Sequence, residues 1–181
     1  MAPPQNSPAA PFFPEFLREG FFPIRVAEIS DAEALKRLIN EAFVVERVAI
    51  EGDRIDREGV LLNMRSGSFL VHEEDGSIVG CVYVQKKENR CCLGLLSVAP
   101  SLQGTGIGRK LVVAAEEFAN RESCVAMDLR IISARSEVMQ KFYEQLGYSV
   151  TGTSPLPDFV VLKAPCHFIH MSKLLKVSEA S

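Results

Sequence analysis

The chain has 181 residues, of which 47% are apolar and 24% charged, and its formal net charge at pH 7 is −3. This composition is typical of one globular domain that is long enough to bury a continuous core. Without a basic excess, neither nucleic acid nor an anionic membrane is an expected partner. No apolar run reaches the length of a membrane span, and the N-terminus lacks the pattern of a signal peptide, so a cytoplasmic location is expected.

The two ends of the chain differ in composition from the middle. Residues 1–20 combine five prolines with small and aromatic residues, and such a density of proline prevents regular backbone hydrogen bonding. We therefore expect a flexible, Pro/Phe-rich arm over residues 1–20. A single domain is expected over residues 21–175, followed by a short C-terminal tail over residues 176–181.

The first part of the domain is predicted to contain a strand and two helices. A strand is expected over residues 21–28 and a helix over residues 30–43, because apolar residues recur there at helical spacing. Ser30 and Glu33 have the spacing of a capping box at the start of this helix. A second helix is expected over residues 57–65.

Three strands should follow as an antiparallel meander, at residues 68–74, 77–87 and 90–98. Asp75 and Gly76 separate the first two strands, and this dipeptide favours a two-residue hairpin turn.

The last part of the domain is predicted to contain two helices, at residues 107–118 and 136–147, and three strands, at residues 124–132, 148–153 and 167–175. Ser133 or Ser136 is expected to cap the second of these helices. Its inward face should carry Val138, Met139, Phe142 and Leu146. The first helix and the strand after it should form a crossover unit, which makes the sheet mixed.

Glycines stand at alternate positions just before the 107–118 helix, at Gly104, Gly106 and Gly108. Bare backbone at a turn lets successive N–H groups converge on an anion, and the start of a helix adds partial positive charge. A phosphate site is therefore the physical expectation. Arg109 in the first helical turn suits a ligand with several negative charges, although it could equally be an ordinary solvated residue.

Three phosphate-binding patterns compete for this loop. The nucleoside-triphosphate loop requires a glycine followed by lysine and a hydroxyl residue, which this chain lacks. The dinucleotide fingerprint would need a glycine where Arg109 or Leu111 stands, and it fits poorly. The third pattern, Q/R-x-x-G-x-G/A, is matched by Gln103, Gly106 and Gly108.

This third match, with "LLSVAP" before it and "FYEQLGY" after it, resembles the acyl-CoA loop of the GNAT superfamily of N-acetyltransferases. The resemblance extends from about residue 24 to residue 174. It implies an α+β fold with a central mixed, mostly antiparallel sheet of six to seven strands. Helices would cover both faces, and a splayed strand pair would form the acyl-CoA cleft.

The resemblance also implies which residues contact acetyl-CoA as cosubstrate. The free strand edge at Leu96, Ser97 and Val98 would pair with the pantetheine arm, and the N–H near Val98 would polarise the thioester carbonyl. Gln103 belongs to the loop pattern. Backbone amides of the loop would hold the pyrophosphate, at Gly104, Thr105, Gly106, Ile107, Gly108 and Arg109.

Tyr143 resembles the family tyrosine that protonates the departing thiolate, and a phenol is a proton donor at neutral pH. Alternatively, Tyr143 is an amphipathic residue at the edge of a helix. Ser136 stands where many relatives have an asparagine that contacts the cofactor. It could equally serve only as a helix cap.

The general base is left open by the sequence, because the strands around the loop lack the glutamate of many relatives. An ammonium group must lose a proton before it can attack, so some acceptor for that proton is needed. Glu46 is the preferred candidate, since the region after the first helix usually lines the acceptor groove in this family. His167 and His170 are alternatives, although each could be structural. Residues 41–58 carry an excess of three negative charges, which would suit a cationic amine or simply a solvated face.

The five cysteines show no metal-ligand spacing. Neighbours Cys91 and Cys92 would point to opposite faces of a strand, so they cannot jointly hold one zinc ion. No metal is expected, and buried reduced thiols are the simpler interpretation.

The sequence thus predicts an acetyl-CoA-dependent N-acetyltransferase that moves an acetyl group directly to an amine acceptor in a ternary complex. The main alternative is an acyl-CoA-binding regulatory or interaction module with degenerate catalysis, and dinucleotide binding is a third. Dimers are common in the family that the chain resembles, so a homodimer is possible, but the sequence does not determine the oligomeric state.

Overall fold

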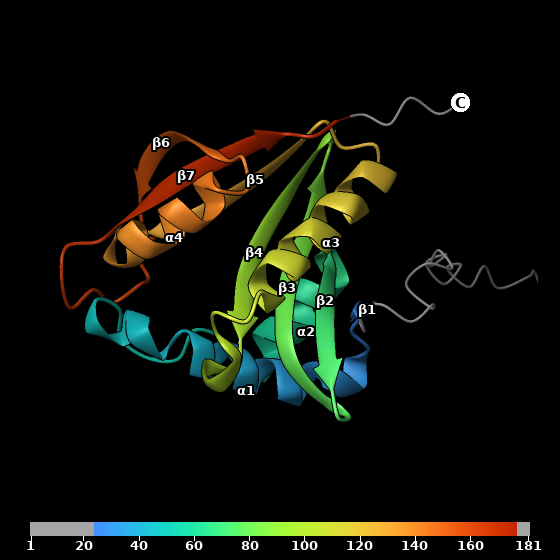
Figure 1. The fold of residues 1–181 in the computed structure, drawn as a ribbon. Coiled ribbons are helices and arrows are strands. Elements are labelled where there is room, and N and C mark those ends of the chain that lie inside the picture. Colours follow the sequence, from blue (N-terminus) through green and yellow to red (C-terminus); the bar gives the residue numbers. More distant parts are fainter. Residues whose placement is uncertain (1–23, 177–181) are drawn as a thin grey trace, which may run out of the picture.

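The computed structural model describes residues 24–176, in which seven strands form one sheet in the order β1-β2-β3-β4-β5-β7-β6 (Figure 1). The strands are β1 (Ile24–Val26), β2 (Ser68–Glu74), β3 (Ser77–Lys87), β4 (Arg90–Val98), β5 (Ala126–Ile132), β6 (Ser149–Pro155) and β7 (His167–Leu174). All neighbours are antiparallel except β4 and β5, which are parallel. The predicted mixed, mostly antiparallel sheet is confirmed. The predicted arm over residues 1–20 and nearly all of the predicted tail lie outside the described residues.

The meander of β2, β3 and β4 has the predicted bounds. Asp75 and Gly76 both have positive φ, 49° and 73°, as a type I′ hairpin turn requires. On β2, Phe69 and Val71 face one helix layer while Leu70 faces the other, so this strand is buried on both sides.

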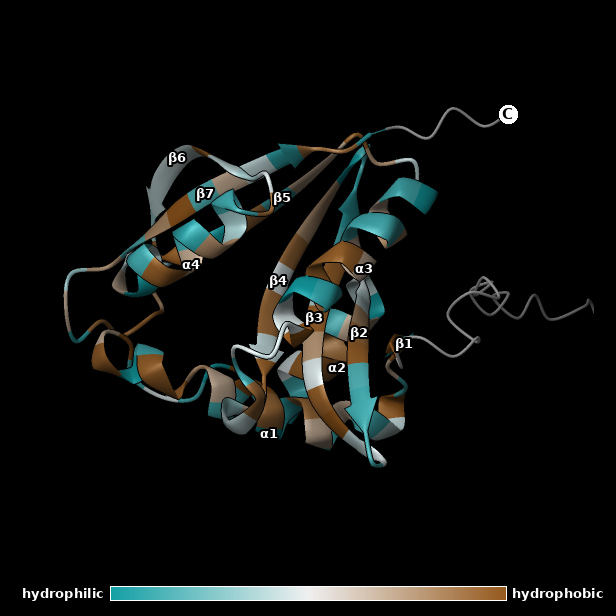
Figure 2. Cartoon of the chain, in the orientation of Figure 1, coloured by the Kyte–Doolittle hydropathy of each residue, from teal (hydrophilic) through white to brown (hydrophobic). Residues whose placement is uncertain are grey.

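Helices cover both faces of the sheet. The four helices of the described chain are α1 (Ala32–Ala42), α2 (Arg57–Ser66), α3 (Ile107–Arg121) and α4 (Ser136–Glu144). The helices α1 and α2 bury their apolar residues against one face of β2 and β3, and α3 packs on the other face (Figures 1 and 2). The helix α4 joins the α3 layer and lies over β5 and β7. None of the helices within residues 24–176 is long and apolar enough to cross a membrane.

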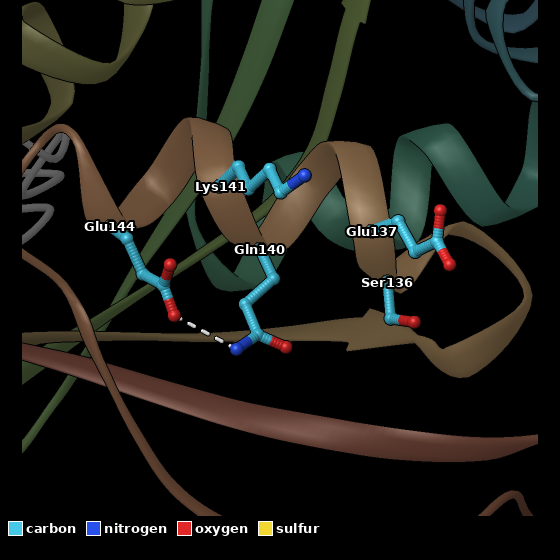
Figure 3. A pocket seen from close by; sticks show the side chains of 5 residues that line it. All are labelled: Ser136, Glu137, Gln140, Lys141 and Glu144. Carbon is cyan, nitrogen blue, oxygen red and sulfur yellow. Dashed lines mark hydrogen bonds between the residues drawn. The ribbon is translucent and has the colours of Figure 1, made fainter.

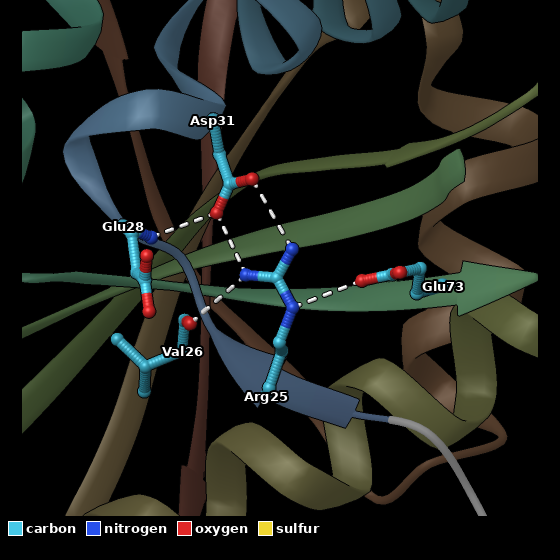
Figure 4. Close-up of polar contacts among 5 residues, drawn as sticks. All are labelled: Arg25, Val26, Glu28, Asp31 and Glu73. Carbon is cyan, nitrogen blue, oxygen red and sulfur yellow. Dashed lines mark hydrogen bonds and ion pairs between the residues drawn. The ribbon is translucent and has the colours of Figure 1, made fainter. Parts of the chain in front are cut away.

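The predicted capping box at the start of α1 is wrong by two residues. A short 3₁₀ turn precedes α1, and there the backbone N–H of Glu28 donates to Asp31 Oδ2 over 2.8 Å (Figure 4). Asp31 also accepts two hydrogen bonds from Arg25, whose Nε donates to Glu73 on β2. The box forms between Glu28 and Asp31 because Asp31 must also pair with Arg25 of β1.

The helix α4 corrects two further predictions. Val138 was expected to face inward but is 73% exposed, whereas Tyr143 is buried. Neither predicted serine caps this helix: Ser136 is its first residue, and the Ser133 hydroxyl accepts a hydrogen bond from the N–H of His167. Ser133 is drawn into that contact because a 3₁₀ turn carries the chain from β5 into α4.

The parallel strands β4 and β5 separate along their length, and this positions the site. Their register pairs only residues 90–93 of β4 with residues 126–129 of β5. At the narrow end, Arg90 makes two hydrogen bonds of 2.6 Å to Asp128 and one of 2.9 Å to Ser172 on β7. Beyond Leu93 the strands diverge (Figure 1), so the backbone of residues 94–98 pairs with β3 alone.

Candidate active site

A β-bulge bends β4 at the point where it leaves β5. Leu95 and Leu96 together face Val82 of β3, and Leu95 has a positive φ of 50°. A leucine in the left-handed region is strained by about 1–2 kcal/mol, so the surrounding contacts must hold it there. The buried Ser97 hydroxyl donates to the carbonyl of Leu95 over 3.0 Å. The bulge turns the end of β4 away from β5 and keeps the strand edge open.

The open edge of β4 presents the backbone N–H of Val98. The next N–H, that of Ala99, donates to Val79 O of β3 over 2.8 Å. Successive N–H groups of a strand point to opposite sides, so the N–H of Val98 points away from β3 toward the open edge. The carbonyl of Val98 already accepts a hydrogen bond from Gln103 Nε2 over 3.2 Å. Val98 therefore offers a free backbone N–H to a ligand, whereas the side chain of Gln103 stabilises the loop by its hydrogen bond to Val98.

The glycine loop leads from β4 into α3 through exposed residues 103–106. Gly104 and Gly106 have positive φ of 80° and 93°, and nothing within residues 24–176 lies within 4 Å of the place where a Cβ would stand on either. Gly106 is the N-cap of α3, and none of the described side chains caps the first-turn N–H groups. The Thr105 hydroxyl is turned back to the carbonyl of Leu102, at 2.6 Å. An open, uncapped helix N-terminus of this kind fits a phosphate.

The remaining predicted loop residues have distinct surroundings. Ile107 is buried in the core and anchors the start of α3, whereas Arg109 is exposed beside the loop. A Cβ on Gly108 would stand 3.7 Å from Phe142 of α4 and 3.8 Å from Val98. Gly108 thus lies where the start of α3, the end of β4 and the helix α4 meet.

Tyr143 follows Phe142 on α4 and is buried in the core that α4 shares with α3. Its ring packs edge-on between Phe142 and Tyr148, with centroid distances of 5.0 and 5.6 Å. Its hydroxyl has no hydrogen-bond partner among residues 24–176. Burial raises the pKa of Tyr143 well above its usual value, against a smaller lowering by the charge of Arg135. The phenol therefore keeps its proton at neutral pH.

Glu46 lies in a cavity of about 390 Å³ on the other side of the sheet from α3 and α4. Its side chain is only 7% exposed, and Oε2 has no hydrogen-bond partner within the described chain. Burial raises the pKa of Glu46, while the charges of Arg54 and Arg135 lower it by less. The guanidinium of Arg135 thus lies near enough to affect both Glu46 and Tyr143 electrostatically.

The same cavity is lined by residues that the sequence did not single out. Arg130 of β5 lies over the ring of Phe168 of β7 at 4.7 Å, and Arg54 lies over the ring of Phe43 at 5.2 Å. Arg130 belongs to the part of β5 that pairs only with β7. Its neighbours Leu129 and Ile131 face the core, so period-2 alternation was the available sequence signal for an outward Arg130.

The two histidine candidates and the nearby Asp128 do not line the cavity that holds Glu46. His170 Nε2 lies 2.7 Å from the hydroxyl of Ser154, which joins β7 to β6. His167 is exposed, and its backbone N–H is bonded to Ser133. Asp128 forms the ion pair with Arg90 at the narrow end of β4 and β5. Of the acidic and histidine candidates, Glu46 is the buried one with an unpartnered oxygen.

The buried cysteines are poorly suited to act as nucleophiles. All five are free, and Cys81, Cys91 and Cys124 are buried. Burial raises the pKa of the Cys81 thiol to about 12, so it is protonated and unreactive at neutral pH.

A second depression lies on the outer surface of α4 (Figure 3). Ser136, Glu137, Gln140, Lys141 and Glu144 line it, and Gln140 Nε2 donates to Glu144 Oε1 over 2.8 Å. These side chains are exposed or half-buried, and none is an unpartnered buried group. The predicted cofactor contact Ser136 lines this depression, and its contact with a cofactor stays a prediction.

Comparisons with known proteins agree with this arrangement. Residues 65–150, which include β4, the glycine loop and Tyr143, match the family model of the acetyltransferase (GNAT) domain. The chain carries a GNAT acetyltransferase domain. The resemblance identified from the glycine loop is therefore confirmed, and the splayed β4 and β5 are a feature of this GNAT fold.

Solved structures share the fold of this GNAT domain. YncA from Salmonella typhimurium, solved with its cofactor acetyl-CoA, aligns with a TM-score of 0.68 at 22% identity over 87% of this chain and 95% of that chain. The PaiA N-acetyltransferase from Thermoplasma acidophilum, in complex with coenzyme A, aligns with a TM-score of 0.69 at 19% identity, over 83% and 97%. The ribosomal-protein-S18-alanine N-acetyltransferase from Escherichia coli gives 0.67 at 17% identity, over 87% and 95%. Two of these relatives were thus solved with acetyl-CoA or coenzyme A.

One curated relative is similar in sequence. The amino-acid acetyltransferase of Ralstonia nicotianae is 32% identical over 137 residues, which make up 75% of this chain. The match to this chain covers only 28% of the length of the Ralstonia protein.

Proposed function

We propose that this chain is an N-acetyltransferase that moves an acetyl group from acetyl-CoA directly to an amine bound in the same complex. One observation carries the proposal: the open edge of β4 runs into an uncapped glycine loop, while the separated part of β5 lines a cavity with a buried carboxylate. An anion-binding loop and an amine-sized pocket therefore lie at the two sides of one splayed strand pair. The names of the Ralstonia and Escherichia coli relatives support acyl transfer.

The loop side has the features needed to bind acetyl-CoA. Free backbone at Leu96 and Val98 suits the amide groups of a pantetheine arm, and Ser97 holds the bulge that keeps this edge free. The N–H groups from Gly104 to Arg109 suit a pyrophosphate, since no side chain of the described residues caps them. That of Thr105 also donates weakly to the carbonyl of Leu102, at 3.4 Å. Acetyl-CoA, when bound, supplies the activated acetyl group.

Three groups of this chain would then act on the reaction. The N–H of Val98 would stabilise negative charge on the acetyl carbonyl oxygen. Glu46 would take a proton from the incoming amine, and its burial makes it a stronger base than an exposed carboxylate. Tyr143 would donate its proton to the departing thiolate. The charge of Arg135 lowers the pKa of both Glu46 and Tyr143, which links the two groups electrostatically across the splayed strands.

The test is release of free thiol from acetyl-CoA by the purified chain, with a panel of amines as acceptors. Direct transfer predicts that double-reciprocal plots intersect when both substrates are varied. Parallel plots would indicate an acetylated enzyme and contradict direct transfer. Binding of acetyl-CoA without turnover of any amine would instead favour the regulatory module.

A further inference from the structure

The charged residues around Glu46 indicate what kind of amine this cavity accepts. We infer that the acceptor carries a carboxylate beside its amine, as a free α-amino acid does, with Glu46 facing the amine and Arg54 and Arg130 holding the carboxylate. This inference rests on the proposed function, because it names the substrate class of the same site.

Arg54 and Arg130 are available to a ligand. Each guanidinium lies over an aromatic ring, Phe43 in one case and Phe168 in the other. Neither forms an ion pair with a carboxylate of residues 24–176, although both line the cavity. A guanidinium stacked by its face keeps its N–H edge free, and this edge matches the two oxygens of a carboxylate. These arginines therefore have the geometry of a carboxylate site rather than of a structural ion pair.

Glu46 supplies the opposite charge in the same cavity. Its Oε2 is buried and unpartnered, and a buried polar atom without a hydrogen bond costs about 1–3 kcal/mol. An amine or ammonium group placed against this oxygen would satisfy it. The cavity thus offers the unpartnered carboxylate of Glu46 for an amine and the guanidinium groups of Arg54 and Arg130 for an acid.

The walls of the cavity are held in place by backbone contacts. Ile50 and Leu162 form an antiparallel bridge that joins the segment after α1 to the loop between β6 and β7. Two flanking hydrogen bonds, Glu51 N to Val161 O at 3.0 Å and Lys163 N to Ala49 O at 2.8 Å, extend this bridge. The volume of about 390 Å³ suits a small molecule.

The charge of the cavity argues against a polyamine. Residues 41–58 have an excess of acidic residues along the sequence, which suggested a cationic acceptor. In the folded cavity, however, Arg47 pairs with Asp53. Arg54 and Arg130 then face Glu46 and Glu51, so a polycation would meet as many positive as negative groups. A zwitterion with one charge of each sign fits this balance.

The experiment compares amino acids with their matched amides and decarboxylated amines, for example leucine, leucinamide and 3-methylbutylamine. The full chain is supplied with acetyl-CoA, and thiol release is followed for each acceptor. We expect the free amino acids to be the better substrates. Arg54→Gln and Arg130→Gln should raise KM for the amino acid by about 10- to 100-fold, the range for a lost hydrogen bond to a charged group. Turnover of the matching amide should fall less than turnover of the amino acid. Arg130→Gln gives the cleaner comparison, because Arg54 also lowers the pKa of Glu46.

Two controls separate recognition from damage to the fold. Arg65→Gln removes a guanidinium from the exposed last turn of α2, away from the cavity, and should change neither substrate. Arg130→Lys keeps the positive charge but loses the pair of N–H donors that can bind both oxygens of a carboxylate. It should therefore raise KM for the amino acid by less than Arg130→Gln does. Thermal unfolding of each variant should stay near that of the unaltered chain.

The outcomes distinguish this inference from the proposed function. If amides or decarboxylated amines are acetylated as well as the amino acids, the inference is overturned while the acetyltransferase proposal stands. If acetyl-CoA binds but amino acids neither react nor raise the melting temperature of the coenzyme A complex, the inference is likewise overturned. If acetyl-CoA neither stabilises the chain nor yields thiol with any amine, the proposed function itself fails.

Discussion

Tyr143 is the residue whose surroundings most favour a proton donor. It is buried, its hydroxyl has no partner among the described residues, and burial keeps its pKa high. Tyr143→Phe keeps the ring between Phe142 and Tyr148 and removes only the hydroxyl. We expect kcat to fall about 100-fold, a typical share for one general acid, with coenzyme A affinity and stability nearly unchanged.

A matched control for this substitution is Tyr83→Phe. The Tyr83 hydroxyl lies 3.2 Å from that of Ser66, beside the end of α2 and away from the loop and the cavity. Steady-state kinetics should therefore show no change in kcat for Tyr83→Phe. Equal turnover by Tyr143→Phe and the unaltered chain would remove Tyr143 from the mechanism.

Glu46 is expected to lower the stability of the folded chain while it contributes to the reaction rate. A carboxyl group whose pKa is raised by burial favours the folded state most below its unfolded pKa, and this contribution is lost as pH rises through the folded pKa. Once ionised, Glu46 opposes folding, so Glu46→Gln should raise the free energy of unfolding at a pH above the folded pKa, while it lowers kcat/KM. Urea unfolding over a range of pH and thiol-release assays measure the two effects.

The pH dependence gives a second check on Glu46. If its carboxylate accepts the proton of the amine, kcat/KM should rise with pH through a pKa above the ordinary value of 4.5. Glu46→Gln should abolish that limb of the profile. An unaltered limb in the variant would show that another group is the base.

The glycine loop is the element that matters most for the cofactor, and the chain contains a matched control for it. Gly106 at the start of α3 and Gly76 in the β2–β3 turn both have positive φ, and both have open space around a would-be Cβ. Alanine at either position should cost about 1–2 kcal/mol of stability, since an L-residue is strained there. Only Gly106→Ala should also weaken coenzyme A binding.

Urea unfolding and a coenzyme A titration measure these two effects separately. The matched design matters because a general loss of stability would lower binding in both variants. If Gly76→Ala weakens coenzyme A binding as much as Gly106→Ala does, the loop has no special role.

At the scale of elements, local patterns predicted most of the fold. The bounds of β2, β3 and β4 followed from short runs of apolar and β-branched residues and from the turn at Asp75 and Gly76, because both signals are local. The caps of α1 and α4 could not be predicted in this way. Asp31 is recruited by Arg25, and Ser133 by the backbone of His167, and both contacts depend on tertiary structure.

At the scale of the whole molecule, the glycine loop was readable from the sequence and the cavity was not. The loop is contiguous, so its spacing identifies it. The cavity combines the segment after α1, Arg130 of β5, the loop after β6 and Phe168 of β7, which come together only when β5 separates from β4. Glu46 was proposed from the sequence, but its arginine neighbours depend on this closure.

The central claim is that the splayed strands and the glycine loop form an acyl-CoA site. The most direct measurement is a thermal-shift titration of the purified chain with acetyl-CoA, coenzyme A and NAD at matched concentrations. We predict that acetyl-CoA and coenzyme A stabilise the fold, by about 2.7 kcal/mol at a hundredfold excess over the dissociation constant, and that NAD does not. Stabilisation by NAD alone, or by none of the three, would contradict the account.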